Sequence, residues 1–330
     1  MISRWHVTFR SALCGLAAMT ACAGAGAQDW KPQKRVVELV VPNAPGGGND
    51  RTARLVAKLA QEHKLVDATI TIVNKPGAGV VVGMNYLNQH AGDGHFIGIV
   101  AATMTGNYVA GRSTIGPEDI TPIAQLFTEY VAFAARPESG IKDGKDLLAR
   151  LKTDSSAIST SISGGIGNHN HIALALVTRA AGGDVKRLKA VTFNSGGESI
   201  TAALGGHVDM VVSPAGTVLP HVQGGRLRFI ALTAPKRLGG AYADVPVWKE
   251  LGADVVVSNW RAIVGPRGMS PAQIAYWENV LTRVTQTDEW KQMIEKIRAD
   301  PEFLDSSRTR AQIRTDVEEL RAVMSELGLK

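Results

Sequence analysis

Short apolar runs of strand length alternate with amphipathic runs of helical spacing along most of this chain. The pattern predicts strands at residues 36–41, 69–74, 96–101, 123–135, 157–161, 190–193, 208–212 and 228–233. It predicts helices at 51–63, 84–89, 141–151, 169–181 and 198–204, and a helical C-terminal third that begins at Ser270 and Pro271. This alternation is typical of an α/β fold with mostly parallel sheets.

Three of the predicted strands lead into loops rich in Gly, Ser and Asn, and a helix follows each loop. The loops are residues 43–50, 163–168 and 194–197. In open parallel sheets such loops gather at the carboxyl ends of the strands, where ligands bind. A helix N-terminus exposes backbone N–H groups to an anion. The pattern therefore predicts a site for a carboxylate, and Asn49 or Asp50 is the expected N-cap of the first helix.

Candidate ligand contacts come from these loops and from polar residues that follow other strands. They are Asn43, Pro45, Gly46, Gly47, Asn49, Asp50, Thr103, Thr105, Ser163, Gly165, Asn168, His171, Asn194, Ser195, Ser213 and Thr217. Several have a structural alternative: Thr103, Thr105, Ser213 and Thr217 either donate to a ligand or cap a turn. Asp50 is expected to be a cap, because its carboxylate would repel a bound carboxylate, but it would accept the ammonium group of an amino acid.

Two patterns bear on metal binding and catalysis. His169 and His171 form an HxH pair, but no third ligand stands at a suitable spacing, so we expect packed histidines and neither a metal nor a cofactor. A secreted hydrolase using Ser163 is a weaker alternative, since no GxSxG motif surrounds any serine. We therefore expect no catalytic residues and no enzymatic activity.

The N-terminal segment predicts export. Residues 1–27 carry Arg4 and Arg10, then an apolar stretch, and end in Ala25-Gly26-Ala27, which is typical of a secretory signal peptide. Both cysteines, Cys14 and Cys22, lie inside it. Lipid anchoring at Cys22 is an alternative. We therefore expect an exported protein whose signal peptide is removed.

Composition narrows the classes of partner. Removal of residues 1–27 leaves 34 basic and 30 acidic residues, a net charge of +4 spread along the chain. This distribution does not favour nucleic-acid binding. About 300 remaining residues usually form two domains, and a hydrophobic content of 45% suffices for two cores.

A series of glycine- and proline-containing motifs covers nearly the whole mature chain. They are Val41-Pro42-x-Ala44-Pro45-Gly46-Gly47-x-x-Asp50, Asn74-Lys75-Pro76-Gly77-Ala78-Gly79, Asp93-Gly94, Ser163-x-Gly165-x-Gly167 with His171, Leu204-Gly205-Gly206-x-Val208-Asp209, Leu219-Pro220-His221-x-x-x-Gly225-x-Leu227-Arg228 and Val264-Gly265-Pro266-x-Gly268. These motifs, in this order, resemble the substrate-binding proteins of tripartite tricarboxylate transporters, also called Bug receptors.

The resemblance implies a two-lobed periplasmic binding protein of type II with a hinge between the lobes. Residues 28–127 and 234–330 would form the first lobe and residues 128–233 an inserted second lobe, with crossovers near 123–135 and 228–233. Such a receptor captures a small organic carboxylate, here a di- or tricarboxylate, an aromatic acid or an acidic amino acid. It delivers the ligand, as a monomer, to membrane permease subunits.

The chain departs from the family pattern in loops expected to line the cleft. The family often has an aromatic residue at position 43, Tyr-Lys-Gly at 193–195, Asp-Asn at 213–214 and Ser or Thr at 168, and this chain has none of these. The departures suggest a ligand of different charge or size. A sensory receptor that hands its liganded form to a signalling partner is the alternative to transport.

Overall fold

The structure is a computed structural model that describes residues 30–329, so the predicted signal peptide and Cys22 lie outside the described residues. The strands are β1 (Val36–Val41), β2 (Thr69–Asn74), β3 (Phe96–Ala101), β4 (Thr121–Ala135), β5 (Ser159–Ser163), β6 (Lys189–Phe193), β7 (Met210–Pro214), β8 (Arg228–Leu232) and β9 (Ser258–Gly265). The apolar runs predicted all of these strands to within two residues except β9, which the sequence analysis did not predict.

The helices are also close to prediction. They are α1 (Gly48–Glu62), α2 (Val81–Asn88), α3 (Thr103–Val109), α4 (Gly144–Thr153), α5 (His169–Ala180), α6 (Gly196–Leu204), α7 (Ala215–Gln223), α8 (Pro271–Gln286), α9 (Asp288–Ile297) and α10 (Ser306–Glu326). The sequence analysis did not predict α3 and α7, which are short and follow their strands directly. None of the helices from residue 30 to 329 is both long and apolar enough to span a membrane.

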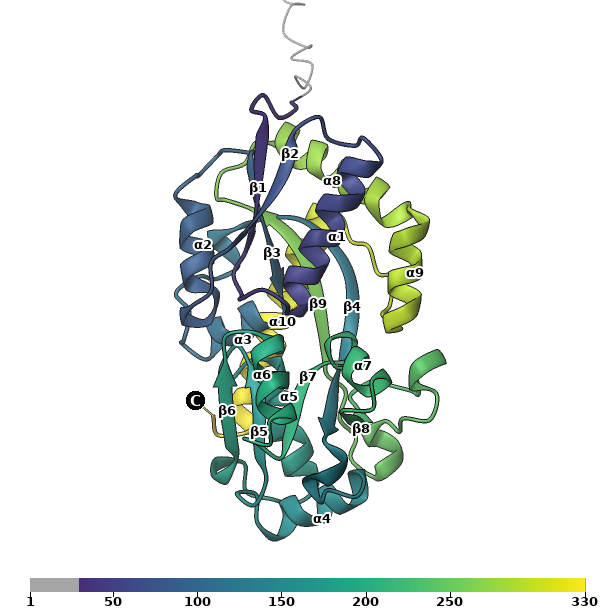
Figure 1. Ribbon diagram of the computed structural model, residues 1–330. Helices are drawn as coiled ribbons and strands as arrows, with labels where there is room; N and C mark the ends of the chain where they lie inside the picture. The colour runs from purple at the N-terminus through teal and green to yellow at the C-terminus, as the bar shows by residue number, and fades with distance from the viewer. Residues whose placement is uncertain (1–29, 330) are drawn as a thin grey trace, which may run out of the picture.

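Two lobes share one curled, mixed sheet with the strand order β2-β1-β3-β9-β4-β7-β5-β6, and β8 also pairs with β4 (Figure 1). Parallel pairing, as expected, joins β1 to β2 and β3, and β5 to β6 and β7. Every pairing that involves β4 or β9 is antiparallel, so the expectation of mostly parallel sheets is wrong for the middle of the molecule. The reason is that these two strands connect the lobes in opposite directions.

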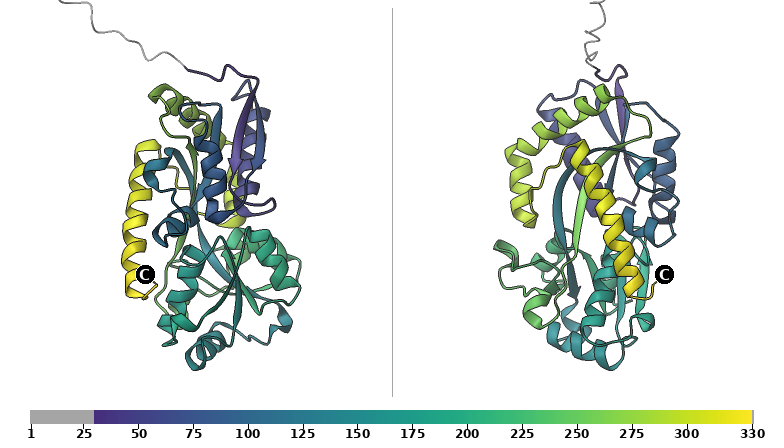
Figure 2. Two further views of the ribbon diagram at one scale, coloured as in Figure 1. Left: turned by 90° about the vertical axis from the view of Figure 1, so that its left-hand side faces the viewer. Right: turned by 180° about the vertical axis from the view of Figure 1, so that it is seen from behind.

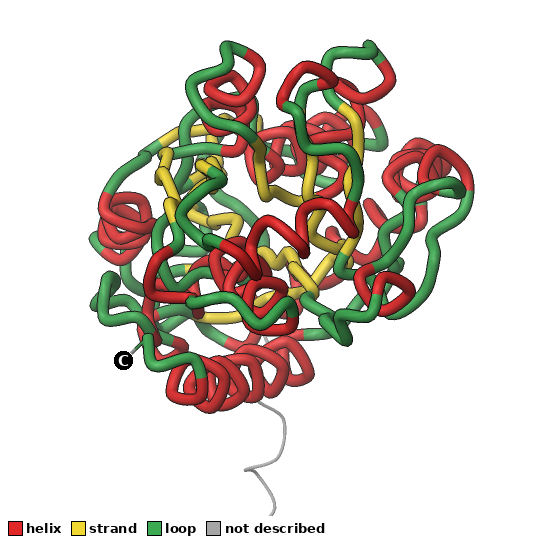
Figure 3. Tube along the Cα trace, turned by 90° about the horizontal axis from the view of Figure 1, so that it is seen from below, coloured by secondary structure: helices red, strands yellow, loops and turns green. Residues whose placement is uncertain are grey.

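Helices cover both faces of the sheet in each lobe, and the strands lie inside them (Figure 3). In the first lobe, α1, α8 and α9 bury one face, with Trp277 and Trp290 in that core. Helices α2 and α3 pack on the opposite face. In the second lobe, α4 and α5 cover one face and α6 and α7 the other. This layering leaves the carboxyl ends of β1, β3 and β5 facing the space between the lobes.

The strand β4 is the main connection between the lobes. Residues 121–130 pair with β9 in the first lobe, and residues 131–135 pair with β7 and β8 in the second. The chain returns next to this crossing: the Thr233 hydroxyl donates to Val257 O at 2.6 Å and accepts from Val131 N–H at 3.0 Å. We therefore propose that the chain crosses between the lobes in β4, within the expected crossover at 123–135, and returns at about residue 257 rather than at 228–233.

The packing of residues 242–248 places the end of the second lobe later in the chain than expected. Residues after 234 were expected in the first lobe, yet Tyr242 and Val247 lie in one core cluster of the second lobe and Trp248 in the other. The reason is that the chain leaving β8 folds back over the second lobe before it enters β9. We therefore propose that the second lobe runs from about Val131 to Val257.

Helix α10 extends along the back of both lobes (Figure 2). Its Ile313 packs with the first lobe, whereas Val317, Leu320 and Met324 pack with Ile172 and Ala175 of α5 in the second. The C-terminal helix thus contacts both lobes rather than the first alone.

Candidate functional site

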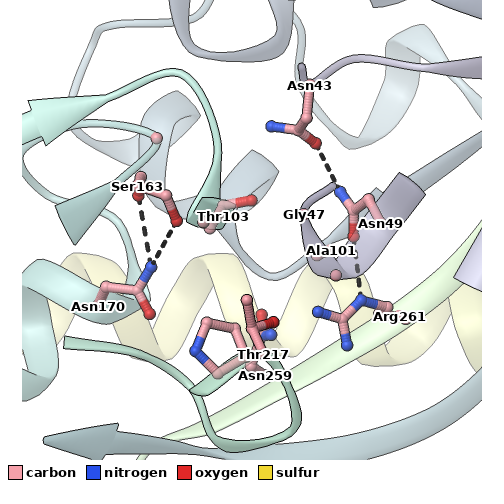
Figure 4. A pocket seen from close by; sticks show the side chains of 14 residues that line it. Asn43, Gly47, Asn49, Ala101, Thr103, Ser163, Asn170, Thr217, Asn259 and Arg261 are labelled. Carbon is pink, nitrogen blue, oxygen red and sulfur yellow. Dashed lines mark hydrogen bonds between the residues drawn. The ribbon is translucent and has the colours of Figure 1, made fainter. Parts of the chain in front are cut away.

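A cavity of about 40 Å³ lies between the lobes, at the carboxyl ends of β1, β3 and β5 (Figure 4). Its lining comes from Asn43, Gly47, Gly48, Asn49, Ala101, Thr103, Ser163, Gly164, Asn170, Gly196, Pro214, Thr217, Asn259 and Arg261. Of these residues only Arg261 is ionisable. The cavity thus presents amide, hydroxyl and guanidinium groups and no acidic side chain.

The first lobe contributes the beginning of α1. Gly47 is the N-cap, and no side chain caps the amides of the first turn. The expected N-cap, Asn49 or Asp50, is therefore wrong: the helix begins earlier, and both residues lie within its first turn. This shift directs the side chain of Asn49 to the cavity, where its Nδ2 donates to Asn43 Oδ1 at 2.8 Å.

A buried ion pair supports the same wall. Arg261 on β9 is 3% exposed and Glu129 on β4 is 2% exposed, and Nη1 of Arg261 donates to Oε1 of Glu129. Nε of Arg261 donates to Oδ1 of Asn49 at 3.0 Å, so the guanidinium also orients the first turn of α1. Two of its three nitrogens are occupied in this way, which fixes the plane of the group.

The second lobe presents Ser163, at the end of β5, and Asn170, in the first turn of α5. Asn170 Nδ2 lies 3.3 Å from both the carbonyl oxygen and the hydroxyl oxygen of Ser163, as Figure 4 shows. Because the Ser163 hydroxyl accepts from Asn170, its own proton is left to donate to another group. The serine is therefore positioned as a donor to the cavity.

The lobes lie closed around this cavity. Asn43 Nδ2 of the first lobe donates to Asn194 O of the second at 3.5 Å, and Arg51 Nη2 donates to Gly216 O at 3.3 Å. On the other side, His169 Nε2 lies 3.0 Å from Asp316 Oδ1 of α10. These contacts join the two lobes, directly or through α10.

The structure brings together part of the predicted site. Asn43, Gly47, Asn49, Thr103, Ser163 and Thr217 line the cavity. The other candidates lie outside its lining: Pro45, Gly46, Asp50, Thr105, Gly165, Asn168, His171, Asn194, Ser195 and Ser213. Most of these hold the loops in place. Asn168 caps α5 by accepting from His171 N–H, Ser195 caps α6 by accepting from Glu198 N–H, and the buried Thr105 hydroxyl donates to Ala102 O.

Others among these candidates lie on the outside or beneath the loops. Pro45 and Gly46 border a separate, open hollow, and the Asn194 side chain is exposed. The Ser213 side chain is fully buried below Gly196, and Gly165 faces Asn107 of α3.

Asp50 has a structural role. It accepts from Gly46 N–H at 3.0 Å, from Arg54 Nε and Nη2 at 2.9 and 3.0 Å, and from Asn74 Nδ2 at 3.0 Å. Burial alone would raise the pKa of this carboxyl, but the hydrogen bonds from Arg54, Gly46 and Asn74 outweigh burial and hold the pKa below its usual value. Asp50 thus fixes the glycine loop through its charge and does not face the cavity.

The histidine pair is packed, as the sequence favoured. His169 and His171 are 4% and 3% exposed, and burial lowers the pKa of His171 to about 4, with the charge of Arg112 acting in the same direction. No group of three or more His, Cys, Asp or Glu residues between 30 and 329 is arranged to hold a metal ion.

The sequence analysis missed part of the lining. Gly48, Gly164 and Gly196 lie in the three predicted loops but were not singled out, and Ala101 and Pro214 end strands. Asn170 was overlooked beside Asn168. Asn259 and Arg261 carried a usable signal: two polar residues spaced by two in an apolar run share one face of a strand. An arginine on a buried strand face points to a partner or a ligand.

Sequence similarity to known proteins identifies the family of this chain. The family model of the tripartite tricarboxylate transporter family receptor, TctC, matches residues 52–329. The chain belongs to this receptor family. Among its relatives, the UPF0065 protein in the gbd 5' region of Cupriavidus necator is 26% identical over 99% of this chain and 97% of its own. Protein BugT of Bordetella pertussis is 23% identical over 90% of each chain.

Solved structures show the same receptor fold. MatC from Rhodopseudomonas palustris, solved with bound malate, has a TM-score of 0.78 at 23% identity over 88% of this chain and 98% of its own. An R. palustris protein solved with adipate has a TM-score of 0.80 at 18% identity over 90% and 98%. The type II binding-protein fold expected from the sequence is thus confirmed for this receptor.

Proposed function

We propose that this receptor works in the periplasm, binds a small organic carboxylate between its lobes, and delivers the ligand to the membrane subunits of a tripartite tricarboxylate transporter. One observation carries the proposal: the interlobe cavity combines a buried guanidinium with neutral donors and has no acid in its lining. The family assignment supports transport, and malate and adipate in two structural neighbours support a carboxylate ligand.

The donors present suffice for useful affinity. Micromolar binding requires about 8 kcal/mol, and each hydrogen bond to a charged carboxylate supplies about 1.5–3 kcal/mol. The uncapped first turn of α1, the hydroxyls of Thr103, Ser163 and Thr217, and Nη2 of Arg261 all border the cavity. Three or four such bonds reach the required free energy, and the α1 dipole adds about 0.3–1 kcal/mol more.

No catalytic step is proposed, since the cavity lining holds no general base and no activated nucleophile. Ser163 interacts with Asn170 rather than with a histidine. Ligand binding would instead shift the population of the closed state, which the membrane partner recognises.

Calorimetry on the purified protein tests the binding step. We would titrate malate, adipate, benzoate and glutamate into the native protein and into Ser163→Ala. For an acid that binds, loss of the Ser163 donor should weaken affinity by about tenfold to a hundredfold. The matched control is Ser325→Ala, an exposed position on α10, which should change nothing.

Absence of heat and of any rise in melting temperature with all four acids at millimolar concentration would contradict carboxylate binding. Delivery is tested separately by the uptake of the labelled acid into cells with and without this receptor. Binding without any loss of uptake would contradict the transport role while leaving the binding role intact.

A further inference from the structure

A second, larger cavity adjoins the first between the lobes. It has a volume of about 220 Å³ and lies among α1, β4, α7 and α9. Gly48, Thr217 and Arg261 line both cavities. The two spaces therefore meet along these three residues, on either side of the Arg261 guanidinium.

The second cavity is mainly apolar. Its apolar lining consists of Leu55, Phe127, Leu219, Pro220, Met293 and Ile297. Arg51 and Lys296 add positive charge, and neither has an acidic partner within 4.0 Å among the described residues. A hydrophobic group is favoured inside this space, and a negative net charge is favoured for the molecule that carries it.

Hydrogen-bond donors, more than charge, set the orientation. Glu129 lines the second cavity and not the first, and its carboxylate already accepts from Arg261, from Gly216 N–H at 3.4 Å and from Asn259 Nδ2 at 3.4 Å. It offsets part of the positive charge that Arg51 and Lys296 give the second cavity, and most of the remaining lining there is apolar. The lining of the small cavity has neutral hydrogen-bond donors and no acid, so the ligand carboxylate is favoured there.

The sizes agree with this division. A space of about 40 Å³ holds only a few water-sized groups, comparable to one carboxylate and far less than a tricarboxylic acid. A dry apolar cavity of about 150 Å³ is enough for benzene. The second cavity, at about 220 Å³, therefore has room for a ring or for a chain of several carbons.

Gly48 and Arg261 form the junction. A Cβ added at Gly48 would overlap the Arg261 guanidinium and lie 3.1 Å from Thr217 Oγ1, so only glycine leaves this passage open. Nε and Nη1 of Arg261 are held by Asn49 and Glu129. Within the described residues Nη2 has no such partner, which leaves one N–H pair of a buried guanidinium for a ligand at the junction.

We propose that the two cavities form one elongated site, and that the ligand is a carboxylate with a compact apolar body. Its carboxylate occupies the small cavity next to Nη2 of Arg261 and Thr217, and its aliphatic chain or single ring fills the large cavity. The inference rests on the proposed function and names the substrate class for that same site.

A homologous series of monocarboxylates tests it on the native protein. We would measure acetate, butyrate, hexanoate and octanoate by calorimetry, with competition for the weakest. Each methylene buried in the large cavity should tighten binding by about fourfold until the space is full. Affinity that stays flat or falls beyond acetate would overturn the elongated site.

The same series separates this inference from the proposed function. If malate or adipate binds and added methylenes bring no gain, the receptor function stands and the apolar extension fails. If no carboxylate binds, the proposed function fails as well.

Filling the cavity gives an independent test. Met293 lines only the large cavity, so Met293→Trp should weaken hexanoate at least tenfold and change acetate by less than twofold. Met293→Ala, which enlarges the space, is the matched control and should not weaken hexanoate. If Met293→Trp does not fold, Leu55→Trp on α1 fills the same cavity. Unchanged hexanoate affinity in a folded tryptophan variant would contradict the proposal.

Discussion

The two loops that face each other across the cleft have similar compositions but are held in different ways. Residues 43–50 of the first lobe depend on charged groups: Asp50 with Arg54, and Arg261 with Asn49 and Glu129. Residues 163–168 of the second lobe depend on neutral amides. Asn168 accepts from His171 N–H at 3.1 Å and donates to Ser163 O at 2.6 Å.

The difference explains why α1 offers uncapped first-turn amides to the cleft and α5 does not. In the second lobe the amide side chain of Asn168 caps α5 and uses one of the orphan N–H groups itself. In the first lobe the nearest acid, Asp50, binds the loop and Arg54 instead, so α1 begins at Gly48 without a side-chain cap. We therefore expect the first loop to be the stronger anion binder and the more sensitive to pH.

The largest expected loss of stability comes from removing the arginine that supports residues 43–50. Arg261→Met leaves Glu129 buried without its cationic partner, which should lower the free energy of unfolding by about 3–5 kcal/mol. Urea denaturation measures the change. The double variant Arg261→Met/Glu129→Gln removes both charges and should recover much of the loss. A cost below about 1 kcal/mol for the single variant would show that the pair does not stabilise this wall.

A second change removes the charge of Asp50. Asp50→Asn weakens the hydrogen bonds from Arg54 and should cost about 1.5–3 kcal/mol at neutral pH. Because the pKa of Asp50 is lowered in the folded state, its contribution is present above the usual pKa of 3.8 and is lost as the pH falls through the folded value. The gap between wild type and variant should therefore narrow in acid.

Melting temperatures from pH 6 to pH 3 measure that gap. The exposed Asp67→Asn serves as the control for general loss of an acidic charge. A gap that stays constant across this range would mean that Asp50 does not hold the loop through its ionised form.

Loss of the capping amide in residues 163–168 should lower stability less than the changes in the first loop. Asn168→Ala removes the cap of α5 and should cost about 0.5–2 kcal/mol, with the same value at pH 4.5 and pH 7 because no charge is lost. Asn168→Ser retains a cap acceptor and should restore part of the stability. Denaturation at both pH values is the measurement, and a strongly pH-dependent cost would remove the distinction between the loops.

The smallest expected effect comes from giving the first loop a cap like that of the second. A Cβ at Gly47 would make only ordinary contacts, 3.6 Å from Gly196 N and 3.7 Å from Ser195 Cβ. Gly47→Ser should raise stability by a few tenths of a kcal/mol, while carboxylate affinity falls because the serine occupies a first-turn amide. Gly47→Ala has no cap acceptor and is the control. Equal affinities for both variants would contradict a role for the uncapped turn.

Much of the fold could be predicted because its signals are local. Apolar runs of strand length and Ser270-Pro271 at the start of α8 mark elements that later packing leaves in place. Helix α3 was missed because Thr103–Val109 is short and contains Gly106 within it. Strand β9 was missed because its polar residues, Asn259 and Arg261, interrupt the apolar run.

The site was predictable in its loops but not in its individual contacts. Asn49 and Asn168 each follow glycines near the start of a helix, and the sequence does not show where within one turn the helix begins. That difference makes Asn168 a cap and turns Asn49 toward the cavity. The partner of Arg261 lies on a strand 132 residues away, a separation that no local pattern links.

The amino-acid sequence alone determined the order of most strands and helices and the glycine loops at the ends of strands, because these depend on propensity and periodicity, which act over a few residues. Motifs spread along the chain carried the resemblance to the receptor family. Only the tertiary structure decided which donors face the cavity, where the lobes divide, and that an apolar space lies behind Arg261. Those features arise where β4, β9 and α1 meet, and the interactions that fix them join residues far apart in the chain.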